Sequence, residues 1–337
     1  MRRTIIVRAF QLFFLVVFVL LSVLAFYTWQ TWDRSYDEVM LPEAQASTDP
    51  AVIARGEYLV YGPAHCVECH AKSFEEFQKV ANNEKVSLQG GTKFTAPPLG
   101  SVYSKNLTPD KETGIGRYTD RQIARMMRYN VRPNGRASIA LMMPFHNMSD
   151  EDMIAIISFL RAQPPVRNEV PENEWTVAGK VIKSLSSTFK PREAVNPPKT
   201  APDEKPTVQR GEYLARYVAN CVGCHTPLDD TTFQPSGPEF SGGEEFEPMP
   251  MPGADMKTWF RTPNITPMKG SALMKFPDRA TFVARFKVGG RQHPGTPMPW
   301  EAYAKMSPED VGALYEFLHA LPAQPGFTGE VTFHKTE

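Results

Sequence analysis

The sequence repeats itself once. The pentapeptide that begins at Arg55 recurs unchanged at Arg210, and the motif Cys-x-x-Cys-His that begins at Cys66 recurs at Cys221, both at an offset of 155 residues. Further matches at offsets of 155 or 158 residues are Met143-Pro144 with Met298-Pro299, Asn106-Leu107-Thr108-Pro109 with Asn264-Ile265-Thr266-Pro267, and Ser149-Asp150-Glu151-Asp152 with Ser307-Pro308-Glu309-Asp310. Two copies indicate a tandem duplication, because a solenoid needs at least three repeats.

Each copy contains Cys-x-x-Cys-His, which is the attachment signature of c-type haem. The two thiols lie one helical turn apart, so that each can add to a haem vinyl group, and the histidine that follows becomes the proximal iron ligand. We therefore predict two covalently bound haem c groups. The attachment residues are Cys66 and Cys69 with His70 as iron ligand in the first copy, and Cys221 and Cys224 with His225 in the second.

Other uses of these residues explain the pattern less well. The two motifs contain all four cysteines of the chain. A zinc site would use the same residue types, but each copy offers three ligands without a consistent fourth. A thioredoxin-like redox pair would need a βαβ context that is missing, and a disulfide between Cys66 and Cys69 would leave His70 unexplained. The haem interpretation accounts for every cysteine.

The register of the repeat predicts the second axial ligand of each iron. Met143 follows Cys66 by 77 residues, and Met298 follows Cys221 by the same distance. We therefore predict Met143 and Met298 as axial ligands. Met142 adjoins Met143 and stays an alternative. Thioether ligation raises the reduction potential of a haem, which suits a carrier on an oxidising pathway.

Five further residues are weaker candidates for iron ligation. Met249 and Met251 each precede a proline but have no counterpart in the first copy, so we interpret them as loop or surface packing. His146 and His293 lie near the ligand loops without aligning with each other, and His65 directly precedes a haem cysteine. For these histidines we expect a surface position or a contact with a haem propionate.

The N-terminal segment predicts a membrane anchor. Residues 9–29 carry no charge, and at about 1.5 Å per residue they span roughly 30 Å, the thickness of the hydrocarbon core of a bilayer. Three arginines and no acid precede this stretch, and it ends among aromatic residues: Phe26, Tyr27, Trp29 and Trp32. Because positive flanking charge stays in the cytoplasm, we expect a single pass through the bacterial cytoplasmic membrane, with all that follows in the periplasm.

A cleaved signal peptide is the alternative for this segment. Ala44-Gln45-Ala46 has the small side chains of a cleavage site, but it lies far beyond an apolar stretch that is longer than a usual signal core. The overall charge excludes a different class of protein. The 37 basic residues balance 37 acidic ones, which excludes a nucleic-acid binder that relies on a basic surface. A retained anchor is therefore the favoured interpretation.

The rest of the chain predicts helices separated by Gly- and Pro-rich loops without strand alternation. Serine caps and apolar stripes predict short leading helices over 50–60 and 207–218, middle helices over 119–129 and 278–286, and closing helices over 149–161 and 307–321. The connection between the copies contains Val177, Val181, Leu185 and Phe189 at four-residue spacing. This spacing predicts one amphipathic helix that packs its apolar side on a domain.

The sequence resembles the class I c-type cytochromes, and more narrowly the multihaem cytochrome subunits of membrane-bound periplasmic alcohol, aldehyde and gluconate dehydrogenases. The residues that carry the resemblance are 106–116, Met143-Pro144, 149–152 and 158–160. The resemblance covers nearly everything from Val52 to Leu321. It implies an all-α fold in which two tandem class I cytochrome c domains follow the N-terminal transmembrane helix, with the first and last helices of each domain crossing at Gly56 and Gly211.

The chain departs from those subunits in two ways. They generally carry three haem motifs, whereas this chain has two, and its membrane segment lies at the N-terminus. The expected organisation is a cytoplasmic tail over 1–8, a transmembrane anchor over 9–32, cytochrome c domains over 50–163 and 207–323, a proline-rich linker over 164–206 and a tail over 324–337.

Three functions are compatible with this organisation. The first is a membrane-anchored dihaem electron carrier without a substrate site of its own. It would take electrons from a periplasmic dehydrogenase or a quinol-oxidising complex and pass them toward a cytochrome or an oxidase. The second is a dihaem redox enzyme, peroxidase-like or thiosulfate-oxidising, which needs an open iron position that the matched methionines would fill. The third is an assembly subunit with incidental haems, which two intact motifs argue against. The sequence favours the carrier.

Overall fold

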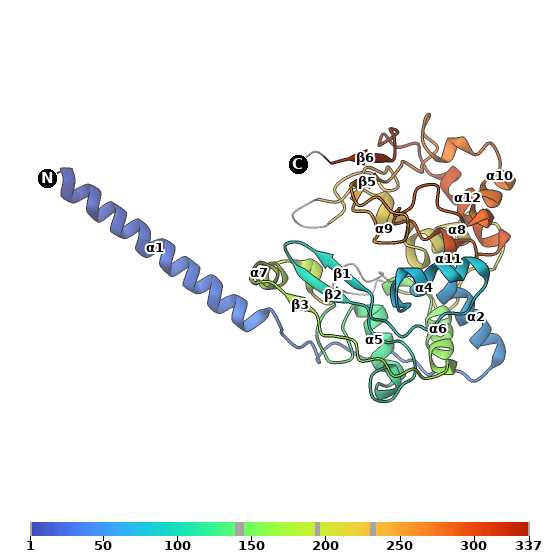
Figure 1. Ribbon diagram of the computed structural model, residues 1–337, viewed down its shortest axis with the longest axis horizontal. Helices are drawn as coiled ribbons and strands as arrows, with labels where there is room; N and C mark the ends of the chain where they lie inside the picture. Colours follow the sequence, from blue (N-terminus) through green and yellow to red (C-terminus); the bar gives the residue numbers. More distant parts are fainter. Residues whose placement is uncertain (1, 139–144, 193–195, 230–233, 336–337) are drawn as a thin grey trace.

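The computed structural model describes residues 2–138, 145–192, 196–229 and 234–335. A long helix, α1 (Arg2–Thr31), projects from a body formed by the rest of the chain (Figure 1). Helices make up 44% of the structure and strands 8%. The expectation of an all-α fold is therefore correct only for the larger part, because short antiparallel strands form two small sheets.

Each small sheet has three strands. The first has the order β1 (Lys93–Ala96), β2 (Gly100–Tyr103) and β3 (Glu174–Trp175), and the second has the order β4 (Glu245–Phe246), β5 (Thr258–Arg261) and β6 (Thr332–His334). β3 and β4 are two residues long. Alternation of apolar and polar side chains cannot be recognised over such lengths, which explains why the sequence did not predict these strands.

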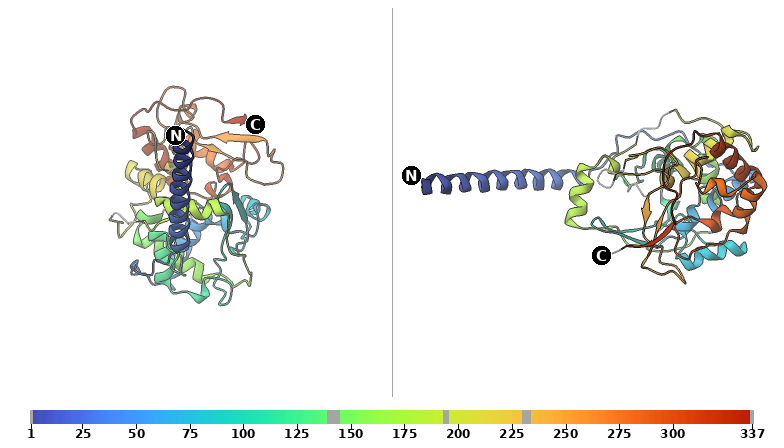
Figure 2. Two further views of the ribbon diagram at one scale, coloured as in Figure 1. Left: turned by 90° about the vertical axis from the view of Figure 1, so that its left-hand side faces the viewer. Right: turned by 90° about the horizontal axis from the view of Figure 1, so that it is seen from above.

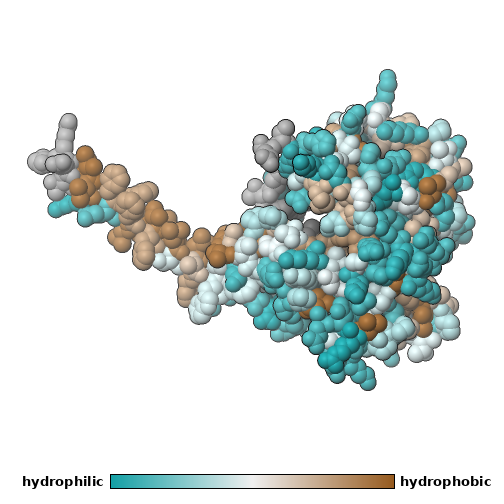
Figure 3. Space-filling model, in the orientation of Figure 1, coloured by the Kyte–Doolittle hydropathy of each residue, from teal (hydrophilic) through white to brown (hydrophobic). Residues whose placement is uncertain are grey.

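α1 differs in character from the body. Ile5–Thr31 is long and apolar enough to cross a membrane, judged by length and composition, and its most apolar part is not buried by the body. Figure 3 shows this helix as a mostly hydrophobic rod against a largely hydrophilic body. The view from above in Figure 2 shows that α1 extends away from the body and reaches it only at its C-terminal end.

The predicted leading, middle and closing helices are all present. They are α2 (Pro50–Tyr61), α5 (Asp120–Tyr129) and α6 (Asp150–Ala162) in the first repeat, and α8 (Val208–Tyr213), α10 (Arg279–Val288) and α12 (Pro308–Ala320) in the second. A π-helical turn, η5 (Leu214–Val218), continues α8. Ser149 and Ser307 cap α6 and α12, each accepting a hydrogen bond from the backbone N–H three residues later.

The leading and closing helices of each repeat cross at a glycine. A Cβ atom at Gly56 would lie 1.9 Å from the carbonyl oxygen of Ala155, and one at Gly211 would lie 1.9 Å from that of Ala313. No side chain larger than hydrogen fits such an approach, so α2 packs backbone to backbone on α6, and α8 on α12. These are the two positions at which the resemblance implied a crossing.

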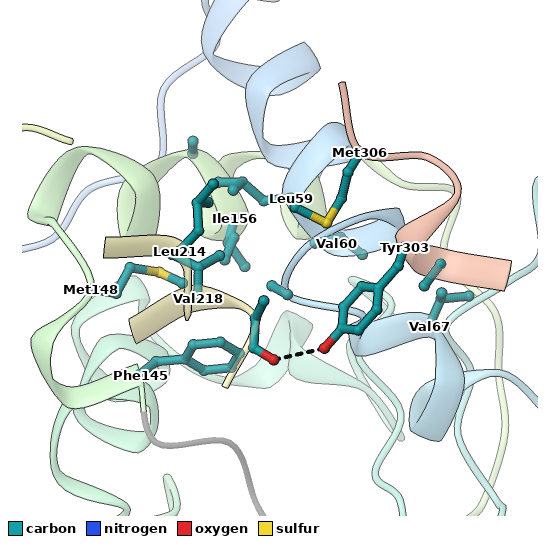
Figure 4. Close-up of a cluster of buried hydrophobic side chains, with 14 of the residues drawn as sticks. Leu59, Val60, Val67, Phe145, Met148, Ile156, Leu214, Val218, Tyr303 and Met306 are labelled. Atoms are coloured by element: carbon teal, nitrogen blue, oxygen red, sulfur yellow. Dashed lines mark hydrogen bonds between the residues drawn. The ribbon is translucent and has the colours of Figure 1, made fainter. Parts of the chain in front are cut away.

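The remaining helices are short or connect the repeats. They are α3 (Cys66–His70), α4 (Phe74–Gln78), η1 (Lys79–Asn82), η2 (Ile115–Arg117), η3 (Phe145–Asn147), α7 (Val177–Leu185), η4 (Ser187–Phe189), α9 (Cys221–His225), η6 (Leu273–Lys275) and α11 (Trp300–Tyr303). One hydrophobic cluster includes side chains of both repeats. Figure 4 shows Leu59 and Val67 of the first repeat in the same cluster as Leu214 and Met306 of the second.

Two equivalent tyrosines join the repeats. The Tyr58 hydroxyl donates to Asp310 Oδ2 over 2.6 Å and accepts from the Ser307 N–H over 3.2 Å. In the opposite direction, the Tyr213 hydroxyl donates to Asp152 Oδ2 over 2.8 Å, and it accepts from the Ser149 N–H over 3.1 Å. Each tyrosine therefore binds the first turn of the closing helix in the other repeat.

Each of the two aspartates is also paired with an arginine of its own repeat. Arg55 Nε lies 2.9 Å from Asp152 Oδ1, and Arg210 Nε lies 2.7 Å from Asp310 Oδ1. Arg210 and Asp310 are 0% and 1% exposed. The interface between the repeats is thus built from two copies of one arginine–aspartate–tyrosine arrangement.

The amphipathic helix predicted in the connection is present as α7, but its predicted packing is wrong. Val177 is 82% exposed and Leu185 56%, whereas Phe189, in η4, is buried. The reason is steric. A Cβ atom at Gly179 would lie 2.1 Å from the Leu99 carbonyl oxygen, so the glycine side of α7 lies closest to the body and most of the apolar side is left uncovered.

The helix crossing gives a stability test. Gly211→Ala should lower the free energy of unfolding by about 1–3 kcal/mol, because the added methyl group overpacks the contact with Ala313. Gly290→Ala is the matched control, since a Cβ there meets only Val288 Cγ1 at 3.9 Å. Urea unfolding followed by circular dichroism measures both variants. Equal midpoints for Gly211→Ala and Gly290→Ala would contradict the crossing.

The reciprocal tyrosines give a second test. Tyr58→Phe and Tyr213→Phe should each lower the free energy of unfolding by about 1–3 kcal/mol, because each removes a hydrogen bond from a buried carboxylate. Tyr315→Phe is the control, since its hydroxyl bonds to no residue in the described part of the chain. If Tyr58→Phe unfolded at the same urea concentration as this control, the interface between the repeats would be wrongly assigned.

Candidate haem-attachment sites

The two Cys-x-x-Cys-His motifs form equivalent short helices. α3 follows His65, whose φ is 35°, and α9 follows Asn220, whose φ is 53°. Both residues have left-handed backbone, which Asn and His adopt more readily than most other residues. The chain therefore turns sharply just before the first cysteine of each motif, and its two thiols lie about one helical turn apart on one short helix.

A backbone carbonyl orients the histidine of each motif. His70 Nδ1 lies 2.7 Å from the Lys105 oxygen, and His225 Nδ1 lies 2.8 Å from the Pro263 oxygen. Because a carbonyl oxygen can only accept, Nδ1 carries the proton and Nε2 keeps a free lone pair. Burial lowers the pKa of His70 and of His225, which favours the neutral imidazole that binds a metal. This is the usual orientation of a metal-ligating histidine.

The repeated Asn-x-Thr-Pro motif explains how that carbonyl is held. Asn106 Oδ1 accepts from the Thr108 N–H over 2.9 Å, and Asn264 Oδ1 accepts from the Thr266 N–H over 2.8 Å. Each asparagine also donates through Nδ2 to a distant carbonyl, 2.8 Å away in both repeats. The asparagine thus fixes the backbone directly after the carbonyl that binds the histidine.

A glycine supports each motif from the other side. The Gly90 N–H donates to the His70 oxygen, and the Gly242 N–H donates to the His225 oxygen, both over 2.8 Å. Both glycines have left-handed backbone, with φ values of 68° and 70°, and a Cβ at either would lie within 2.5 Å of neighbouring backbone. Each glycine can pass this close to the segment whose carbonyl binds the histidine only because it has no side chain there.

The donor set fits a covalently attached haem. None of the four cysteines forms a disulfide, and their side chains are half-buried or, for Cys224, exposed. Each motif therefore offers two thiols for thioether bonds and one oriented imidazole for iron. Within the described residues no group of three or more His, Cys, Asp or Glu side chains could hold a bare metal ion, so the zinc interpretation gains no support.

The methionine predictions have different outcomes. Met143 and its alternative Met142 lie outside the described residues. Met298 is half-buried and packs against the hydrophobic cluster. The segment of Met249 and Met251 lies beside the loop that leads to Met298, since the Met249 N–H donates to the Gly295 oxygen over 2.8 Å. Met251 is buried, so it packs inside the structure rather than at the surface.

The three histidines outside the motifs occupy different surroundings. His293 is exposed. The ring of His65 contacts that of Tyr303 edge to face at 5.4 Å. His146 lies close to the Met143 position in sequence, and its buried Nδ1 makes no hydrogen bond to the described part of the chain.

Sequence analysis missed a buried charged cluster that links the two repeats. Arg291 Nε lies 2.9 Å from Glu301 Oε1, and Arg291 Nη2 lies 3.4 Å from Glu68 Oε1. All three side chains are less than 9% exposed. Burial raises the pKa of Glu68 to about 7, although Arg291 lowers it. The only signal in the sequence is a glutamate inside the first motif where the second has Gly223.

Tyr303 lies between the two motifs. Its hydroxyl donates to the Ala219 oxygen over 2.7 Å, just before α9 (Figure 4), while its ring contacts His65, just before α3. Together with the ion pair between Arg291 and Glu68, this contact places the two motif helices next to each other. The structure therefore brings both sets of predicted attachment residues to one region of the molecule.

Comparison with known proteins agrees with these observations. No known protein-family profile matches the sequence. The chain is 27% identical over 300 residues to the alcohol dehydrogenase (quinone) cytochrome c subunit of Gluconacetobacter polyoxogenes, covering 85% of this chain and 59% of that protein. It is 32% identical over 200 residues to the gluconate 2-dehydrogenase cytochrome c subunit of Pantoea cypripedii, covering 56% of this chain and 41% of that protein.

Two further relatives match the chain at 25% and 27% identity. The chain is 27% identical over 289 residues to the fructose dehydrogenase cytochrome subunit of Gluconobacter japonicus, of which it covers 54%. It is 25% identical over 228 residues to a diheme cytochrome c-type protein of Cereibacter sphaeroides, of which it covers 68%. The chain thus covers between 41% and 59% of the length of the three dehydrogenase subunits. At modest identity over most of its own length, it is a homologue of the cytochrome c subunits of alcohol, gluconate and fructose dehydrogenases and of a diheme cytochrome c.

Proposed function

We propose that the chain is a membrane-anchored dihaem cytochrome c that transfers electrons on the periplasmic side of the bacterial cytoplasmic membrane. Its donor would be a dehydrogenase or a quinol-oxidising complex, and its acceptor a cytochrome or an oxidase. The observation that carries the proposal is the doubled orientation of His70 and His225, each with Nδ1 on a backbone carbonyl and Nε2 free. The names of the relatives support a dehydrogenase as donor.

The residues assigned to each haem follow from the two motifs. In the first repeat Cys66 and Cys69 would form the thioether bonds and His70 would bind the iron, with Met143 on the opposite side. The corresponding residues in the second repeat are Cys221, Cys224, His225 and Met298. When bound, haem iron gains and loses one electron. With Met143 and Met298 bound to the two irons, neither iron would have a position left for a substrate, which favours a carrier over an enzyme.

The arrangement of the chain supports two haem domains in contact. We assign them to residues 50–163 and 207–323, with the linker over 164–206 between them. The reciprocal bonds of Tyr58 and Tyr213 and the shared hydrophobic cluster hold the two halves together. Because the motif helices adjoin, an electron that enters at one site has a short path to the other.

α1 supports the membrane anchor. Its apolar part, Ile5–Thr31, is long enough to cross a bilayer. Arginines precede this part and aromatic side chains collect at its end, which is the arrangement expected when the N-terminus stays in the cytoplasm. The body that follows α1 would then lie in the periplasm. Covalent haem attachment is expected in that compartment, and so are the proposed electron donors of the protein.

Removal of one attachment site should halve the haem content. Cys66→Ser/Cys69→Ser should leave one haem per chain, held by the second motif, because serine cannot form a thioether bond. The pyridine haemochrome absorbance per mole of protein, measured after acid–acetone extraction, gives the count. Ser73→Ala, close to the motif but outside it, is the control and should keep the full absorbance. An unchanged absorbance in the double variant, or pigment that extracts completely from the wild type, would contradict two covalent sites.

Loss of the predicted thioether ligand should open one iron. Met298→Ala should lower the reduction potential of one haem and let that haem bind carbon monoxide when reduced, since the thioether no longer blocks the sixth position. Spectra in a redox titration measure both effects. Met274→Ala, at an exposed methionine, is the control. If Met251→Ala reproduced the change and Met298→Ala did not, the ligand assignment in the second repeat would be wrong.

A further inference from the structure

α7 presents an apolar stripe that the body does not cover. Val177, Val181 and Leu185 follow one another at four-residue spacing, so they lie along one side of the helix. Val177 is 82% exposed and Leu185 56%, while Val181 between them is half-buried. Exposed large apolar side chains are few in the described part of the body. Two of them on one nine-residue helix indicate a surface that another medium or molecule covers.

The orientation of α7 is fixed by its contacts on the opposite side. Gly179 packs against the Leu99 carbonyl, where no Cβ would fit. The Thr176 N–H donates to the same oxygen over 3.1 Å, and the Thr176 hydroxyl accepts from the Gly179 N–H, which caps the helix. Lys183 is 8% exposed. The helix therefore cannot rotate to bury its apolar stripe without losing these contacts.

The end of α1 lies directly against α7. Lys180 Nζ lies 4.4 Å from the centre of the Trp32 ring, and Lys183 Nζ lies 5.0 Å from that of Trp175 and 4.0 Å from Asp33 Oδ1. Asp33 also pairs with a residue of the body, since its Oδ1 lies 2.7 Å from Arg136 Nε. The direction of α1 is thus coupled to the position of α7.

Figure 2 shows the consequence of this coupling. α7 lies at the side of the body from which α1 departs, and it runs across the direction of α1 rather than along it. A helix perpendicular to a membrane span lies parallel to the membrane surface. The exposed side of α7 faces away from the body, and therefore toward the membrane that α1 would cross.

We propose that α7 is a membrane-surface helix, whose stripe of Val177, Val181 and Leu185 inserts at the boundary between headgroups and acyl chains in the leaflet where α1 emerges. This inference rests on the proposed membrane anchoring by α1. Trp32 and Trp175, each stacked against a lysine, suit this boundary because their rings are apolar and their polar atoms stay near water. The nearby acids would not repel an anionic surface strongly, since Asp33 is paired with Arg136 and Glu174 with Lys93.

The continuity with α1 favours lipid over a protein partner. The bilayer is already next to α7 wherever α1 spans it, because Lys180 of α7 stacks on Trp32 directly after the end of α1. Insertion of α7 adds a second point of attachment beside α1, which prevents the body from tilting freely. The two haem-attachment sites are then held at a set height above the membrane, where a membrane-bound donor can reach them.

The full-length, haem-loaded protein provides the test. Val177→Cys and Leu185→Cys introduce a thiol that a nitroxide can label, because the native cysteines are bound to haem. Val288→Cys is the matched control, at a side chain that is 76% exposed on α10. The labelled proteins are reconstituted into vesicles of phosphatidylethanolamine and phosphatidylglycerol. Electron paramagnetic resonance then compares collisions with oxygen, which concentrates in lipid, and with a water-soluble nickel chelate.

The inference predicts that the ratio of oxygen to nickel accessibility is severalfold higher at Val177→Cys and Leu185→Cys than at Val288→Cys. An equal ratio in protein that stays in the vesicles would overturn the inference and leave the anchor intact. Loss of the protein from the vesicles would overturn both. Labels that are aqueous in vesicles but shielded in native membranes would assign the stripe to a protein partner instead. The haem spectrum reports the proposed carrier function separately in every sample.

Discussion

The contact between the repeats depends on two carboxylates that are buried at helix N-termini. Asp152 and Asp310 each lie in the first turn of a closing helix, where the helix dipole favours negative charge. Each is also bound by an arginine of its own repeat and a tyrosine of the other. The arginine stays with its aspartate if the repeats separate, but the tyrosine does not, and removing its hydrogen bond from a buried carboxylate costs about 1–3 kcal/mol. The two halves therefore cannot separate without exposing both carboxylates and losing both tyrosine bonds.

This interface sets the position of the predicted attachment sites. α2 and α8 carry the tyrosines, and each leads within a few residues to the Cys-x-x-Cys-His helix that follows it. Fixing the two leading helices against the opposite closing helices brings α3 and α9 together. Tyr303 and the pair of Arg291 with Glu68 then fill the space between them. The proximity of the two motifs is thus a consequence of how the repeats are joined, and it supports the proposed electron transfer between two haems of one chain.

The sequence predicted whatever one copy determines by itself. The register of the repeat located the motif histidines and the serine caps, because each depends on residues close in sequence or matched between copies. The crossing glycines were implied only by the resemblance to the class I cytochromes. It could not predict that Tyr58 binds Asp310 rather than Asp152, since an identical pentapeptide allows bonding within either repeat or between them. The pairing of Arg291 with Glu68 joins residues more than two hundred positions apart, and no periodicity reports such a contact.

α7 shows a second limit of sequence interpretation. Four-residue spacing of Val177, Val181 and Leu185 shows that one side of the helix is apolar, but it does not show whether protein or lipid covers that side. Gly179 sets the orientation of α7. The close approach of the Leu99 carbonyl turns the glycine side of the helix toward the body, so the apolar side is left uncovered. β3 and β6 escaped prediction for a related reason, since each pairs with a strand that is distant in the sequence.

The intact mass of the full-length chain, purified from membranes and denatured in acid, tests the central claim most directly. Covalent attachment at both motifs predicts the mass of the polypeptide plus two haem groups, because thioether bonds survive denaturation. A mass equal to that of the polypeptide alone, with or without pigment released into solution, would contradict the account of both sites.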